Sequence, residues 1–157
     1  MAHTAVTAGG VSMEFDSRAL DAKLTAFAKT TRNMLPFWRS VGEILRKSIV
    51  QNFRVGGRPD PWKPLSEITK QYKRKNKNKI LVESGRLRGS INYKADASGV
   101  SVGTSGVEYA AIHQFGGDTG TATIPARPYV LIQPEDMETI AQDLEDYLTL
   151  PFEGVGK

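Results

Sequence analysis

The chain of 157 residues contains no cysteine and only two histidines, His3 and His113. The lack of cysteine excludes disulfides, zinc ribbons, iron–sulfur clusters and thiol catalysis, and it suits a reducing compartment. Two histidines exclude a multi-histidine metal site. No apolar run approaches the roughly 20 residues that a transmembrane helix needs. We also expect no secretory signal, because Met1 to Gly10 carries neither a basic residue nor a long apolar segment.

The usual catalytic signatures are missing as well. The glycine-rich stretch Gly116 to Gly120 lacks the lysine of a phosphate-binding loop, and no Gly-x-Ser-x-Gly elbow occurs. His113 could serve as a base or as a structural residue that hydrogen-bonds a nearby backbone group; the structural interpretation is favoured, because no carboxylate is placed to orient it. A magnesium nuclease would need a compact acidic cluster, and acids gather only near the C-terminus. We therefore expect a protein that is not an enzyme and has no catalytic residue, cofactor or metal.

What the chain does have is an uneven distribution of charge. Residues 54–94 contain twelve Lys or Arg and three Asp or Glu, whereas residues 134–157 contain seven Asp or Glu and one Lys. Such asymmetry indicates a nucleic-acid partner for the basic part, or a protein partner of opposite charge. That partner could be a second copy of the same chain.

Apolar periodicity predicts helices near both ends. Leu20, Leu24 and Phe27 mark a first helix, and a second begins near Pro36 and ends before Gly56. A last helix begins at Pro134, and Pro151 ends it. Between them we expect a short helix after Ser66, a turn or short helix around residues 84–90, a β-hairpin over residues 91–103 and a short helix over residues 109–115. Residues 124–131 should be extended, because Pro125 and Pro128 disfavour helix before them.

The predicted fold is α+β: a small antiparallel β-sheet flanked by an N-terminal helix pair and a C-terminal helix. We expect a flexible arm over residues 1–13, one domain over residues 14–150, and a C-terminal tail over residues 151–157. Extended loops are expected at residues 54–64, 73–79 and 116–123. Trp62 in the first loop could be an exposed contact for a partner or a lid on the core. The pairs Gly56-Gly57 and Gly116-Gly117 are typical of tight turns or of positive φ angles.

A set of short motifs resembles one known family. They include Gly57, Trp62, then Gly85, Leu87 and Arg88, then the block Tyr109, His113, Gln114, Phe115, Gly116 and Gly117, and last Pro125, Arg127 and Pro128. Their order and spacing are similar to those of the phage virion-morphogenesis family, the tail-completion proteins of Mu-type contractile-tailed phages and prophages. The resemblance extends from about Leu45 to Leu148.

The resemblance implies a structural protein of the virion that acts late in assembly, at the neck or upper tail, as a tail terminator or head–tail joining protein. It implies a homo-oligomeric ring, commonly of six copies, around the DNA channel. Neck, tail-tube or sheath proteins would be its neighbours, and no membrane would be involved. It would be found in the virion, and in the host cytoplasm during assembly. No catalytic residue is carried over from this family.

Physical chemistry suggests tasks for the matched residues. Arg127, held between two prolines, suits a bidentate contact with a carboxylate, either on a neighbouring subunit or in the same chain. Tyr109 and Phe115 should pack His113 and Gln114 into a fixed turn. Leu87 should point inward while Arg86 and Arg88 stay outside.

The basic run at residues 73–79 has three possible interpretations. Lys73, Arg74, Lys75, Lys77 and Lys79 could contact channel DNA, an acidic protein neighbour, or solvent alone. A basic nucleic-acid-binding module is the alternative function. In a ring, one face of a subunit meets a different face of the next, so the basic centre and the acidic C-terminal helix could be the two faces.

Overall fold

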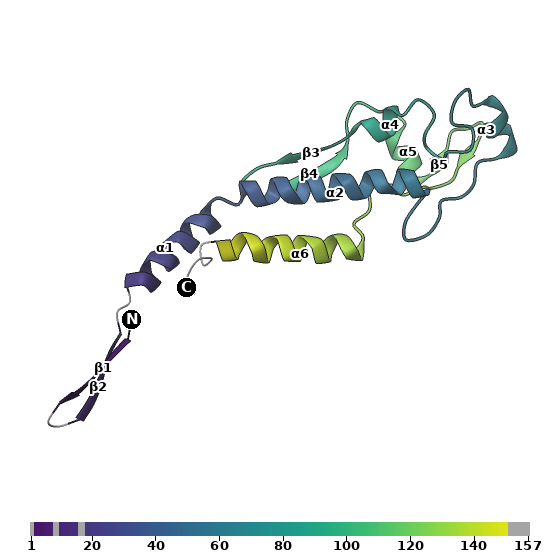
Figure 1. Cartoon of the computed structure of the whole chain (residues 1–157). Helices are drawn as coiled ribbons and strands as arrows, with labels where there is room; N and C mark the ends of the chain where they lie inside the picture. Colours follow the sequence, from purple (N-terminus) through teal and green to yellow (C-terminus); the bar gives the residue numbers. More distant parts are fainter. Residues whose placement is uncertain (1, 8–9, 16–17, 151–157) are drawn as a thin grey trace.

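The computed structural model describes residues 2–7, 10–15 and 18–150 and is elongated around one long helix (Figure 1). The helices are α1 (Arg18–Arg32), α2 (Leu35–Val55), α3 (Glu67–Tyr72), α4 (Arg86–Gly89), α5 (Ala110–Phe115) and α6 (Pro134–Thr149). The strands are β1 (Ala2–Thr7), β2 (Gly10–Phe15), β3 (Ile91–Ala95), β4 (Val100–Thr104), β5 (Gly117–Asp118) and β6 (Thr123–Ile124). The predicted α+β class is confirmed.

The strands of the described residues form three separate antiparallel pairs, β1–β2, β3–β4 and β5–β6, where a single sheet was expected. The pair β1–β2 lies in the segment for which the sequence predicted a flexible arm, so its regular pairing was not foreseen. The pair β5–β6 lies in the expected loop at residues 116–123. The C-terminal tail, residues 151–157, lies outside the described residues.

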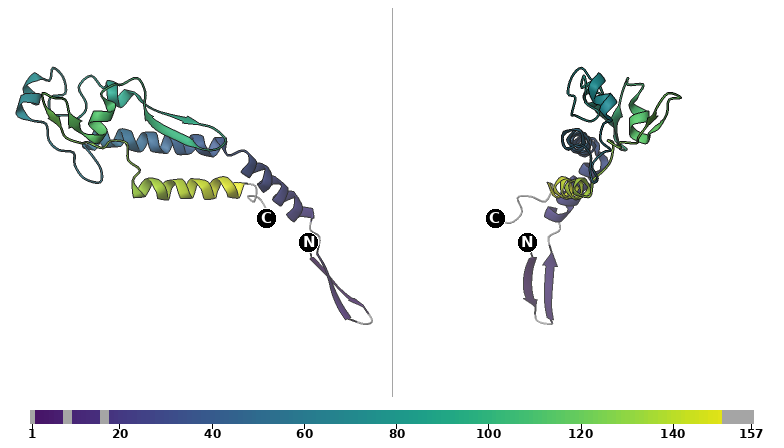
Figure 2. Two further views of the ribbon diagram at one scale, coloured as in Figure 1. Left: turned by 180° about the vertical axis from the view of Figure 1, so that it is seen from behind. Right: turned by 90° about the vertical axis from the view of Figure 1, so that its right-hand side faces the viewer.

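Helix α2 is the element on which the others are arranged. Pro36 stands in its first turn, and Gly56 ends it in the left-handed region with φ 86°, donating its N–H to the carbonyl of Asn52. The hairpin β3–β4 packs on one side of α2, and α6 packs along another (Figures 1 and 2). Gly42 allows the close approach of the hairpin, because a Cβ there would clash with the Tyr93 ring.

The core lies at the C-terminal end of α2. Phe53 contacts the Trp62 ring edge-on at a centroid distance of 5.6 Å and the Tyr129 ring at 5.3 Å. The Trp62 indole also donates to the carbonyl of Pro128 at 2.8 Å. Trp62 is buried, so it belongs to the core and is not an exposed contact. The other buried members of this cluster are Ile49, Val82, Leu87, Ile91 and Ala110.

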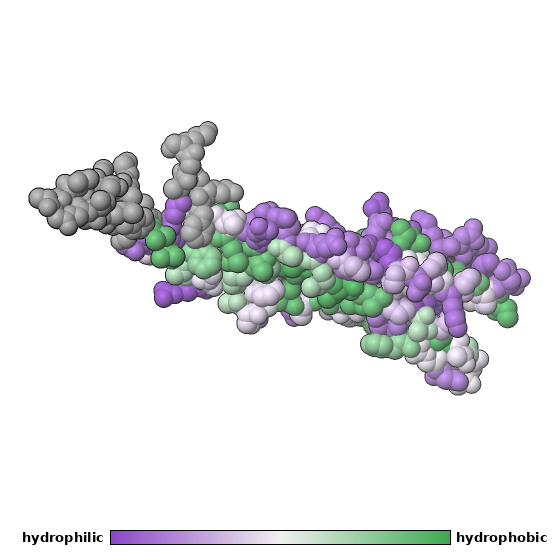
Figure 3. Space-filling view, turned by 90° about the horizontal axis from the view of Figure 1, so that it is seen from below, coloured by the Kyte–Doolittle hydropathy of each residue, from purple (hydrophilic) through white to green (hydrophobic). Residues whose placement is uncertain are grey.

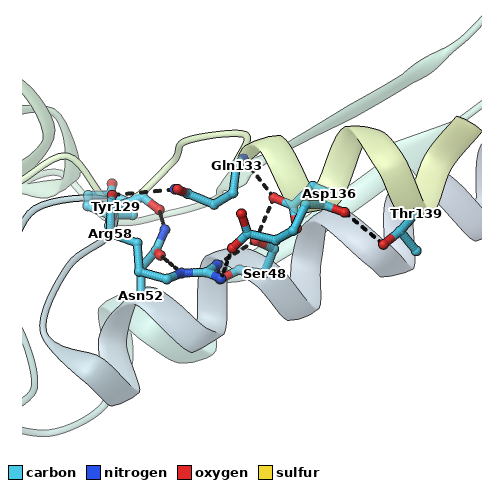
Figure 4. A network of polar contacts seen from close by, with 8 residues as sticks. Ser48, Asn52, Arg58, Tyr129, Gln133, Asp136 and Thr139 are labelled. Atoms are coloured by element: carbon cyan, nitrogen blue, oxygen red, sulfur yellow. Dashed lines mark hydrogen bonds and ion pairs between the residues drawn. The ribbon is translucent and has the colours of Figure 1, made fainter.

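A buried polar junction joins α2 to the segments that follow it (Figure 4). The amide of Asn52, which is 0% exposed, donates to the carbonyl of Tyr129 at 2.9 Å, and its oxygen accepts from Arg58 at 2.8 Å. Arg58 also donates to the carbonyl and hydroxyl oxygens of Ser48, and the Ser48 hydroxyl donates to Asp136 at 2.6 Å. These contacts attach the loop after α2, the segment before α6 and the first turn of α6 to one helix.

Loss of the Asn52 amide should therefore destabilise the whole fold. Asn52→Ala leaves the Tyr129 carbonyl and the Arg58 Nε–H without these partners inside the protein, so we expect the free energy of unfolding to fall by about 2–4 kcal/mol. Urea denaturation followed by circular dichroism measures the loss. Asn33→Ala is the control, because Asn33 is exposed and should change stability by less than about 0.5 kcal/mol. Equal effects of the two changes would contradict the importance of this junction.

Candidate interaction groove

A groove of about 880 Å³ lies at one end of the molecule, among the segments that carry the motifs. Its walls come from α3, residues 73–75 and 81–87, α5 and residues 122–127. Segments that are far apart in the sequence therefore lie side by side around the groove. Ser66 fixes the start of α3 by accepting from the N–H of Thr69, as expected of a helix cap.

Gln114 fixes the extended segment that comes after the groove-lining residues 122–127. Its side-chain oxygen accepts from the N–H groups of Tyr129 and Val130, both at 3.0 Å, and its amide donates to the Val130 carbonyl at 3.2 Å. The Gln114 side chain thus makes the hydrogen bonds with the extended backbone at Tyr129 and Val130 that a neighbouring strand would otherwise make. Of the block from Tyr109 to Gly117, this residue has the clearest structural task.

Two glycines of this block differ from each other. Gly116 has φ 74° and lies against the backbone of residues 124–126, so the expectation of a positive φ is confirmed there. Gly117 has no positive φ and begins β5, so of the two alternatives drawn from the sequence a positive φ does not apply at that position. Gly57, with φ 115°, lies equally close to the backbone of Asp60 and Trp62.

Among the described residues the side chain of Arg127 contacts no carboxylate, so the intrachain salt bridge that the sequence offered as one alternative is not made. Its guanidinium is buried and donates to the carbonyls of Lys63 at 3.0 Å and Pro64 at 3.2 Å. Burial lowers its pKa from the ordinary value of an arginine. Arg127 therefore attaches the loop before α3 to the Pro125–Pro128 segment and closes the floor of the groove.

The basic run is not uniformly exposed either. Lys73 is buried, and its ammonium donates to the carbonyls of Lys79 at 2.6 Å and Val82 at 3.0 Å. Burial lowers the pKa of this ammonium, and the nearby Glu83 carboxylate partly opposes the shift. Lys73 organises the loop at residues 73–82 and is not available to phosphates. The other four residues of the run, Arg74, Lys75, Lys77 and Lys79, are exposed.

His113 lies on α5 at the edge of the groove, and its ring meets the Tyr109 ring edge-on at 5.7 Å. Its Nδ1 is buried and has no hydrogen-bond partner among the described residues, so the backbone hydrogen bond expected of this side chain is not made at that atom. Burial, followed by the charge of Arg127, lowers the pKa of His113 and favours the neutral ring. The main chain of His113 has a structural role, because its carbonyl accepts from the Arg127 N–H at 2.8 Å.

Phe115 departs most from its predicted role. It is 77% exposed, so it does not pack His113 and Gln114. Tyr109, the other aromatic of the block, is partly exposed but does contact His113. Sequence reasoning also missed Ile68 and Tyr72, which lie one turn apart on α3 and are largely exposed. The absence of any buried residue on α3 means that both belong to a free surface.

The groove therefore combines exposed positive charge with apolar side chains that are partly buried, among them Leu65, Leu81 and Ile124. Arg74, Lys75 and Arg86 are exposed along its rim, and Glu83 is the acidic residue among those that line it. Leu87 points into the core between the exposed Arg86 and Arg88, as predicted, and Gly85 begins α4 with φ 85°. This surface suits a protein segment that is acidic and partly apolar.

Among the described residues, no group of three or more His, Cys, Asp or Glu is placed to hold a metal ion. None of the described helices has the length and apolar character needed to span a bilayer.

Comparison with known proteins gives a consistent result. The model of the phage virion morphogenesis family matches residues 15–149. The chain is also 34% identical over 138 residues to the Mu-like prophage FluMu G protein 2 of Haemophilus influenzae, an alignment that covers 86% of this chain and 93% of that protein. No solved structure matches the chain.

The close approach at Gly116 generates a testable prediction. A Cβ at Gly116 would lie 2.8 Å from the backbone nitrogen of Ala126, whereas Gly120 has a similar φ of 80° with open space around it. Both Gly116→Ala and Gly120→Ala impose a strained φ, but only the first adds a backbone clash. We expect losses of about 2–4 kcal/mol and about 1 kcal/mol, respectively, in denaturant unfolding. Equal losses would show that φ alone matters at Gly116.

Proposed function

The chain belongs to the phage virion morphogenesis family, and we propose that it is a tail-completion protein acting at the neck or upper tail. The family assignment gives a role in virion assembly. The finer proposal is that several copies, six in the simplest case, form a ring around the DNA channel. In that position the protein would end the tail or join it to the head, as a structural component without a reaction of its own.

The observation that carries the proposal is the placement of charge in the fold. Helix α6 carries six Asp or Glu and no Lys or Arg, and it lies along one side of α2 (Figures 1 and 2). The segments that carry Arg74, Lys75, Lys77 and Lys79 lie beyond the other side, at one end of the molecule. Because the two charged regions are separated within one chain, each remains available to a second molecule.

Separated surfaces of opposite charge favour head-to-tail association. A contact between two different faces of identical subunits closes into a ring when the rotation between neighbours is right. Opposite charges then orient the subunits and speed their encounter, and the association weakens as salt screens them. The groove would remain for a neighbouring neck, tail-tube or sheath protein, and the exposed lysines could also approach channel DNA.

The role is tested by electron microscopy of a lysate from a phage or prophage with an early stop codon in this gene. We expect separate full heads and separate tails, or tails of abnormal length, because the junction lacks a component. The same phage with the intact gene supplied from a plasmid is the control and should yield joined virions.

Normal, joined virions without the protein would contradict the proposal. Binding of duplex DNA at 0.15 M salt would then become the next measurement. Its loss on changing Lys75, Lys77 and Lys79 to Gln would support the nucleic-acid-binding alternative.

A further inference from the structure

Helix α1 presents an apolar stripe that its own chain leaves partly uncovered. Leu20 and Leu24, one turn apart, are 45% and 51% exposed, and Phe27 continues the same face with partial burial. An amphipathic helix of this kind gains stability mainly when its apolar face is packed against another element. The sequence predicted a helix at this stripe, and the structure confirms it.

The position of α1 explains why the stripe is left exposed. The hydroxyl of Tyr147, near the C-terminal end of α6, donates to the carbonyl of Asn33 at 2.5 Å, so α6 ends beside the connection between α1 and α2. From that connection α1 continues away from the body, beyond the end of α6 (Figure 1). Little of the body therefore lies beside α1 to cover Leu20 and Leu24.

Helix α6 also has an apolar stripe that its own chain covers only in part. It buries only Asp136 completely, while Ile140, Leu144 and Leu148 remain partly exposed and Met137 is 55% exposed. Figure 3 shows apolar residues gathered in a band on this side of the molecule, next to a row of hydrophilic residues. The band extends from α1 along the length of α6.

The two helices also match in length and charge. α1 has 15 residues and α6 has 16, so each is about 23 Å long. α1 carries four Lys or Arg and one Asp, whereas α6 carries only acids. The basic run at residues 73–79 has the right charge for α6 but no apolar side chain to cover its stripe. Of these two basic segments, α1 offers both properties.

We propose that α1 of one copy packs along α6 of a neighbouring copy, with Leu20 and Leu24 covering the exposed part of the α6 stripe. This interface rests on the proposed association of copies, and it assigns α1, in place of the basic run at residues 73–79, as the basic surface that meets α6. It is heterologous, because α1 and α6 are different faces of the subunit, and it therefore has the geometry that a ring requires. Burial of apolar side chains supplies the free energy of the contact, and the opposite charges set its orientation.

The hairpin β1–β2 directly precedes α1. When α1 packs on a neighbouring copy, the hairpin is brought close to that copy as well. The hairpin register pairs Ala2 with Phe15, Thr4 with Met13 and Val6 with Val11. A two-stranded hairpin alone is marginally stable in water, and it needs a further surface.

The absence of cysteine from the chain allows a direct test. One full-length protein carries Leu24→Cys and a second, with an affinity tag, carries Met137→Cys; the two are mixed and oxidised gently. We expect a disulfide-linked heterodimer, because each chain has one cysteine and the bond can form only between copies. Ala22→Cys in place of Leu24→Cys is the matched control: Ala22 is also exposed but lies about 160° around the helix from Leu24, on the opposite face of α1. It should give little heterodimer.

A second variant separates the interface from folding. Leu20→Glu with Leu24→Glu should shift the protein toward monomer in light scattering while its circular dichroism stays unchanged, and Ala22→Glu with Thr25→Glu, also at exposed positions, should not. Oligomers that persist after the leucine changes, with no Leu24–Met137 heterodimer, would overturn this interface yet leave the proposed role in the neck standing. A protein that is monomeric at every concentration would overturn it as well.

Discussion

The pairing of the buried Asn52 amide is the constraint on which the remaining structure depends. Burial of an amide is tolerated only when its donors and acceptors are satisfied, and here the partners come from two distant segments, Arg58 and Tyr129. Arg58 extends the network to Ser48, whose hydroxyl holds Asp136. A network of this kind admits few alternative arrangements, so it fixes both the loop after α2 and the start of α6.

This junction also determines which surfaces face outward. It directs the acidic helix α6 along one side of α2, while Trp62, Gln114 and Arg127 assemble the groove at the end of the molecule. The most buried motif residues therefore hold the fold, and the exposed ones, such as Phe115 and Arg88, are free to contact other molecules. This division favours association, because a surface that is already rigid loses less conformational entropy when a partner binds.

Local patterns were enough to predict the helices, the β3–β4 hairpin and the inward direction of Leu87, because each depends on residues close in sequence. Lys73, Arg127 and Phe115 could not be placed in this way. Lys73 and Arg127 can be buried because backbone carbonyls distant from them in sequence accept their hydrogen bonds. Gln114 is held by the backbone of Tyr129 and Val130, not by Phe115, which is exposed. Asn52 lies between the apolar residues Ile49 and Phe53, which was the available signal for a buried polar group.

The central claim is that copies of this chain form a structural ring where head and tail meet. Electron cryomicroscopy of purified virions that carry this gene tests it most directly. The account predicts a ring of density at the junction into which the body formed by α2, α6 and the β3–β4 hairpin fits, with each copy contacting the next. Virions in which this protein is absent, or lies away from the junction, would contradict it.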